Sequence, residues 1–134
     1  MIKVTGIIAM CKRDVDGNLD EFIYRHNAVL TSLKEDVIRT LVNSSVLKRI
    51  ERVAFKHGAT STTASVTNTA FGPDGVSVTA SFSASFTASS NLTVSEVQAL
   101  GVSGAATTAY LSAAASVALN NGDSFGIQWV VKIQ

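Results

Sequence analysis

Residues 76–88 read VSVTASFSASFTA, and this stretch decides the fold class. Apolar residues stand at every even position, while Ser or Thr fills every odd position. A period of two is typical of a β-strand with one buried face, and helical spacing cannot produce it. Residues 125–133 alternate in the same way, with Phe125, Ile127 and Trp129 on one face. Two such strands predict a sheet that covers a hydrophobic core.

Further alternating segments predict an antiparallel β-sandwich of seven or eight strands, of jelly-roll or immunoglobulin-like type. Asp16-Gly17-Asn18 is a tight-turn signal that joins two strands into a hairpin. Turns are also predicted at residues 72–75 and 120–123, with a Thr/Ser loop after residue 57. The other expected strands are 2–13, 19–26, 50–57, 92–102 and 108–119.

One segment, residues 32–43, breaks the β pattern and predicts a short α-helix. Ser32 is placed to cap its N-terminus, and Glu35 three residues later completes a capping box. Leu33 and Val37 begin an apolar stripe at helical spacing. Because a helix of about ten residues is not stable alone, we expect it to cover an open end or face of the sandwich.

The distribution of charge divides the chain at residue 57. Its 134 residues fit one domain, so we expect a single sandwich over residues 1–134. Residues 1–56 hold most of the charged side chains, while residues 57–134 hold only Asp74, Glu96, Asp123 and Lys132. Strands so poor in charge associate through their edges unless neighbours cover them. The composition therefore predicts a structural subunit of a symmetric homo-oligomer.

The composition also argues against several classes of function. A net charge of +1 is too small for a general nucleic-acid binder. No apolar run approaches the roughly 20 residues that span a bilayer, so we expect no membrane association. The apolar stretch 6–10 is shorter than the core of a signal peptide, so we expect no leader. A single cysteine, Cys11, excludes an intrachain disulfide and a multi-cysteine zinc site.

No arrangement of residues indicates catalysis, and we expect no enzyme activity, metal or cofactor. Residues 14–21 resemble the opening of a calcium loop, but the glycine and the final carboxylate are misplaced, and a hairpin turn explains the same residues. His26 and His57 have no ligand spacing and no third partner. The nucleophile motif G-x-S-x-G does not occur, and an apolar strand usually holds an inert cysteine.

Two groups of residues and the single residue Glu96 are candidates for specific roles. A short basic run is expected to contact a partner protein: Lys48, Arg49, Arg52 and Lys56. Glu96 stands alone among uncharged residues and is expected to cap a strand edge or to pair across a subunit boundary. Four aromatic residues are expected in the core: Phe82, Phe86, Phe125 and Trp129.

The order of short motifs resembles that of small virion structural proteins of tailed bacteriophages. The motifs are His26-Asn27-Ala28-Val29-Leu30 before the helix, residues 94–100 with Glu96, and residues 121–131 with Trp129. Residue 98 is Gln, where the family usually has glycine, and Thr31-Ser32-Leu33 replaces its glycine-rich turn. The resemblance implies a role in the virion, either as a capsid decoration (cement) protein or as a tail or baseplate part.

A virion role implies a protein that is made in the bacterial host cytoplasm and binds copies of itself and a capsid or tail protein. The N-terminal hairpin, residues 2–26, either packs in its own subunit or reaches into a neighbour. The alternative function is a carbohydrate- or receptor-binding sandwich, which needs aromatic rings on its surface; the candidate rings are Trp129, Tyr24 and Tyr110. Trp129 alternates in phase with core residues, which argues against it as such a ring.

Overall fold

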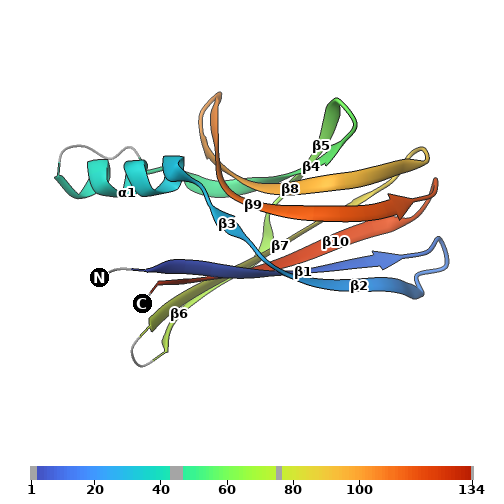
Figure 1. Cartoon of the computed structure of the whole chain (residues 1–134), viewed down its shortest axis with the longest axis horizontal. Helices are drawn as coiled ribbons and strands as arrows, with labels where there is room; N and C mark the ends of the chain where they lie inside the picture. The colour runs from blue at the N-terminus through green and yellow to red at the C-terminus, as the bar shows by residue number, and fades with distance from the viewer. Residues whose placement is uncertain (1–2, 43–46, 75–76, 134) are drawn as a thin grey trace.

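The alternating segments form two antiparallel five-stranded sheets packed face to face (Figure 1). A computed structural model describes residues 3–42, 47–74 and 77–133. Sheet A has the order β2 (Leu19–His26), β1 (Val4–Arg13), β10 (Ser124–Ile133), β7 (Ser77–Thr87) and β6 (Thr67–Asp74). Sheet B has the order β3 (Ala28–Val29), β9 (Ala106–Leu119), β8 (Leu92–Ser103), β4 (Arg49–His57) and β5 (Thr60–Ser65). The expected mainly β fold, an antiparallel β-sandwich, is confirmed.

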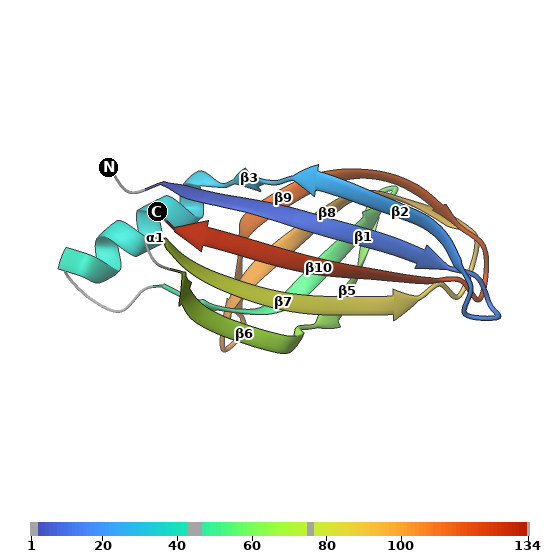
Figure 2. The same ribbon diagram turned by 90° about the horizontal axis from the view of Figure 1, so that it is seen from below.

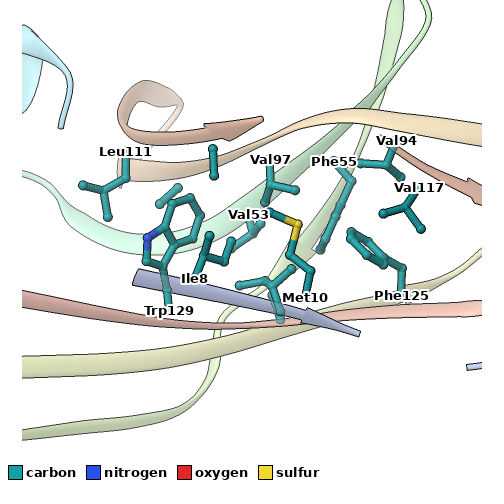
Figure 3. Packing of buried hydrophobic residues seen from close by; sticks show 14 of the residues in the cluster. Ile8, Met10, Val53, Phe55, Val94, Val97, Leu111, Val117, Phe125 and Trp129 are labelled. Atoms are coloured by element: carbon teal, nitrogen blue, oxygen red, sulfur yellow. The ribbon is translucent and has the colours of Figure 1, made fainter. Parts of the chain in front are cut away.

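The core lies between the inner faces of the two sheets (Figure 3). Trp129 and Phe125 of β10 are fully buried, and their cross-strand partners on β7 are Phe82 and Phe86. Phe82 is buried, while Phe86 is partly buried and packs against the core. Phe55 of sheet B lies 5.7 Å from Phe125, ring centre to ring centre, and so connects the two layers. Offset and edge-to-face aromatic pairs of this kind add to the stabilisation from buried area.

The charged and uncharged parts of the chain do not form separate faces. In sheet A, β1 and β2 come from the charged part, and β1 pairs with β10 from the uncharged part. In sheet B, β4 lies between β8 and β5. The two parts share one core, and no boundary in space corresponds to residue 57.

The described residues contain ten strands, against the seven or eight expected. Three of these strands, β3, β5 and β6, were not predicted. Of these, β5 and β6 carry Ser or Thr on both faces and show no apolar alternation. Residues 72–74 lie in β6 instead of a turn, and residue 75 lies outside the described residues. Both β5 and β6 are edge strands, and an edge strand needs less apolar surface than a central one.

The helix α1 (Thr31–Val42) lies at one end of the sandwich, near both chain termini (Figure 1). The predicted capping box is wrong, because the helix already includes Thr31 and the Ser32 hydroxyl donates to the carbonyl of Ala109. Residue 43 of the expected range lies outside the described residues. None of the helix residues is fully buried, so α1 covers the end of the core only in part. No helix in the described ranges is both long and apolar enough to span a bilayer.

Tyr110 of β9 holds the helix in place. Its hydroxyl donates to Asp36 Oδ2 at 2.6 Å and accepts from the backbone N–H of Lys48 at 2.9 Å. The ring is fully buried against Gly101, where any Cβ would stand 2.4 Å from the ring carbon Cε2. Burial, and then the hydrogen bond to Asp36, raise the pKa of Tyr110 above its ordinary value.

Candidate functional site

The predicted basic contact is divided by the fold. Lys48 Nζ lies 3.7 Å from Asp36 Oδ2, and Lys56 Nζ lies 3.9 Å from Glu96 Oε1. Both lysines are therefore next to carboxylates of their own chain. Arg49 and Arg52 are exposed and border a depression of about 350 Å³ next to β5, and Arg49 also borders a second, larger groove. Of the four predicted residues, these two arginines are the ones open to a partner.

Glu96 has its partners within the chain. Besides Lys56, it accepts hydrogen bonds from Gln98 Nε2 at 3.0 Å and from the hydroxyl of Ser112. The groups come from three neighbouring strands on the outer face of sheet B. The expectation that Glu96 caps a strand edge is therefore wrong, since β8 lies inside sheet B. The alternative, that Glu96 pairs across a subunit boundary, stays a prediction.

Two of the residues considered for metal binding or catalysis, Asp14 and His57, make local hydrogen bonds at turns. Asp14 Oδ1 accepts from the backbone N–H groups of Asp16 and Asn18, which closes the β1–β2 turn. His57 is within hydrogen-bond distance of the hydroxyls of Thr60 and Thr62 at the β4–β5 turn. Within the described ranges, no three His, Cys, Asp or Glu side chains gather as a metal site.

Two of the motifs in the resemblance meet in the structure. The indole N–H of Trp129 donates to Asn27 Oδ1 at 2.9 Å, which satisfies a polar group that is otherwise buried in the core. Gly6 leaves the space for this contact, because a Cβ there would stand 2.0 Å from Asn27 Oδ1. Trp129 is thus a core residue with a specific partner and not a surface ring.

The outer face of sheet A carries an apolar and uncharged surface, which we call the neutral face. Cross-strand partners share a face, so the pairs Ile7–Val130, Ala9–Gln128 and Ala9–Tyr24 place these side chains together. Tyr24 is 65% exposed, and Phe22 of the same strand is 53% exposed. The neutral face consists of Ile7, Ala9, Cys11, Phe22, Tyr24, Gly126, Gln128, Val130, Ser81, Ser83 and Ser85. His26, paired with Ile7, and Lys132, paired with Thr5, lie on the same side of the sheet and border it.

Phe22 was not identified as a site residue from the sequence, and Tyr24 was named only as a candidate ring for carbohydrate binding. The available signal was that they stand on the opposite face of residues 19–26 from Ile23, which packs towards the core. The strand 4–13 beside them is also apolar on both faces. Because only one face of sheet A covers the core, the other set of apolar side chains must meet solvent or another molecule.

A second apolar surface is a half-open groove of about 870 Å³ beside α1. Its walls come from α1, the start of β4, β6, β7 and the C-terminal end of β10. Leu41 on the helix and Phe71 on β6 stand 70% and 79% exposed at this end of the molecule. Lys34, Lys48 and Arg49 supply the basic part of its lining.

Comparisons with models of protein families, with curated proteins and with solved structures found no match for this chain. Among the described residues, apolar side chains gather in the open on the neutral face and in the groove beside α1, and exposed apolar patches of this kind suit binding to another molecule.

Proposed function

We propose that this chain is a non-enzymatic structural component of a tailed bacteriophage virion that assembles as a symmetric homo-oligomer. In this role it is made in the host cytoplasm and ends in the particle, as a capsid decoration protein or as a tail or baseplate part. The observation that carries the proposal is the neutral face. A subunit with such a face needs a neighbour to cover it.

The chemistry of the neutral face favours association of like subunits. Its apolar side chains lose water favourably, at about 25 cal/mol for each Å² that becomes buried. Its serine hydroxyls can rotate to donate or accept, so they find partners in a contact between identical surfaces. No ionised side chain has to be desolvated among the residues that define the face.

The virion part of the proposal rests on the order of motifs. The hydrogen bond between Asn27 and Trp129 supports treating two of these motifs as one structural unit, since the asparagine of the first holds the tryptophan of the last.

The attachment point that we propose for a capsid or tail protein is the exposed pair Arg49 and Arg52. Charge reversal at both positions should abolish binding to particles that lack the protein, and unchanged binding would contradict this assignment.

A carbohydrate- or receptor-binding role is the second candidate, favoured by the exposed rings of Phe22 and Tyr24. The two ring planes are inclined by 73° with centres 5.2 Å apart. Because this edge-to-face arrangement offers no shared flat platform, one sugar ring cannot stack on both. Changes in the tyrosine fluorescence of Tyr24 on titration with a glycan panel would favour this second role.

The proposal is tested by placing a charge on the neutral face. Ile7→Lys puts an ammonium group on this face beside Val130, and Val15→Lys makes a comparable change in the exposed β1–β2 turn. We expect sedimentation velocity to show a discrete oligomer for the native chain and for Val15→Lys, and dissociation for Ile7→Lys. Equal assembly of the two variants, or a native chain that stays monomeric, would contradict the proposal.

A further inference from the structure

The strand β2 leaves one side open to a partner. It is an edge strand of sheet A, and among the described residues no strand pairs with it on the side away from β1 (Figure 2). Every residue of β2 except Ile23 is exposed. A long, exposed edge with apolar side chains is a template for pairing with another strand.

The register of the hairpin shows which backbone groups face outward. The N–H of Asn27 donates to the carbonyl of Gly6, so these two residues form a hydrogen-bonded pair. Such pairs alternate along an antiparallel ladder, and the pairs Ala9–Tyr24 and Cys11–Phe22 are therefore of the non-hydrogen-bonded kind. The N–H and C=O groups of Phe22 and Tyr24 consequently point away from β1.

An independent contact agrees with this direction. The guanidinium of Arg25 donates to the carbonyl of Tyr24 at 3.2 Å, which places that carbonyl on the open side of the strand. The contact is exposed and local. A carbonyl oxygen has two lone pairs, so this bond can be shared or released when another strand approaches.

We propose that β2 pairs antiparallel with β2 of a second copy, about a two-fold axis at Ile23. The outward groups of Phe22 then meet those of Tyr24 of the second copy, and each pair exchanges two backbone hydrogen bonds. The same register places Glu21 opposite Arg25 of the second copy. The two-fold axis repeats each pairing, as expected for an isologous interface.

The sequence around Ile23 is complementary to itself only about this axis. Residues 20–26 read DEFIYRH, with acids before the centre, bases after it and an aromatic residue on each side. An axis at Phe22 or at Tyr24 would also let outward backbone N–H and C=O groups pair. An axis at Phe22, however, places Glu21 opposite Ile23 of the second copy, and an axis at Tyr24 places Arg25 opposite it. Opposite charges that face each other across strands stabilise a pair, and like charges destabilise it.

This inference rests on the proposed self-assembly and names the surface through which it begins. Phe22 and Tyr24 belong to the neutral face, so the two sheets A would join into one larger sheet whose neutral face continues across the junction. The four aromatic rings, two from each copy, would lie together at the axis. Edge pairing would therefore remove the exposed edge and cover part of the apolar surface at once.

A charge exchange tests the register. Glu21→Arg and Arg25→Glu each place like charges opposite one another at two symmetric positions, and each should raise the dimer dissociation constant about tenfold or more. The double variant restores opposite charges and should return within about threefold of the native chain. Residues 21 and 25 lie about 13 Å apart in one strand, so rescue cannot come from contact within a chain.

The double variant also controls for effects inside the subunit. Glu21 is the cross-strand partner of Lys12 on β1. Position 21 is arginine both in Glu21→Arg and in the double variant, so any repulsion from Lys12 within the subunit is the same in these two proteins. Sedimentation velocity over a hundredfold range of concentration measures association, and thermal melting confirms that each variant folds. Weak association of the single variants with recovery in the double variant is the expected result.

The other outcomes separate the two levels of the proposal. A native chain that associates, with single variants that associate equally well, would overturn the β2 pairing but leave self-assembly standing. Failure of the double variant to recover would likewise overturn this register. A native chain that never associates would overturn both the pairing and the proposed function.

A disulfide trap gives a second readout that does not depend on charge. At the axis the two Ile23 residues form a non-hydrogen-bonded pair, whose Cα atoms lie about 4.5 Å apart, within the range that a disulfide bridges. In a Cys11→Ser background, Ile23→Cys should form a covalent dimer on mild oxidation. Val15→Cys in the same background is the matched control, and equal cross-linking of both variants would overturn the pairing.

Discussion

Replacing Gly6 with alanine should destabilise the fold through one identifiable contact. The new Cβ would stand 2.0 Å from Asn27 Oδ1, so the asparagine side chain must move and release the indole N–H of Trp129. Asn27→Ala removes the same acceptor directly. A buried donor left without a partner costs about 1–3 kcal/mol. We therefore expect each single variant to lose about 2–3 kcal/mol, or about 8–12 °C in Tm for a domain of this size.

The double variant distinguishes this reasoning from general sensitivity of the core. Once Asn27 is alanine, the clash with residue 6 and the hydrogen bond are both gone, so Gly6→Ala should cost much less in that background. We expect a coupling energy of about 1–2 kcal/mol. Urea unfolding at one fixed protein concentration, followed by the fluorescence of the single tryptophan, gives the free energy of unfolding of the native chain, the two single variants and the double variant. Additive losses, or a Gly6→Ala variant as stable as the native chain, would refute the explanation.

Three further predictions concern α1 and its anchor. Tyr110→Phe removes the hydroxyl between Asp36 and the Lys48 amide and should cost about 1–2 kcal/mol, with faster hydrogen exchange across residues 31–42. The pKa of Tyr110 is raised in the folded state, so the stability that this shift contributes is complete below pH 10.0, the ordinary pKa of tyrosine, and is lost as the pH rises through the folded-state pKa. In urea titrations over that alkaline range, Tyr110→Phe should therefore lose less stability than the native chain. Leu41→Ser, at a side chain that is 70% exposed, should change stability by less than about 0.5 kcal/mol but reduce the binding of an apolar dye to the groove.

The sequence predicted the central strands well because their alternation reports burial directly. The long strand expected at 76–88 is observed as Ser77–Thr87 within the described residues. The edge strand expected at 19–26 also has the predicted bounds, because the turn at residues 16–18 marks where it begins. The start of the helix was placed wrongly because the hydroxyl of Ser32 bonds to Ala109, a residue far along the chain. Local capping rules contain no information about such a tertiary partner.

The candidate surfaces depended on contacts that no local pattern reports. Lys48 and Lys56 look equivalent to Arg49 and Arg52 in the sequence, yet their carboxylate partners come from α1 and β8. The neutral face was recognised only from the register of β1, β2 and β10. The register places one set of their apolar side chains on the outer face of sheet A, away from the core. The charge symmetry of residues 20–26 was visible in the sequence, but its meaning required knowing that β2 is an edge strand.

The most direct test of the central claim is the absolute molar mass of the purified chain by light scattering, over a hundredfold range of concentration. We expect a discrete multiple of 14.0 kDa that persists on dilution, with even numbers of subunits if β2 pairs with itself. A 14.0 kDa species at every concentration would contradict it, because the neutral face and the β2 edge would then remain open in solution.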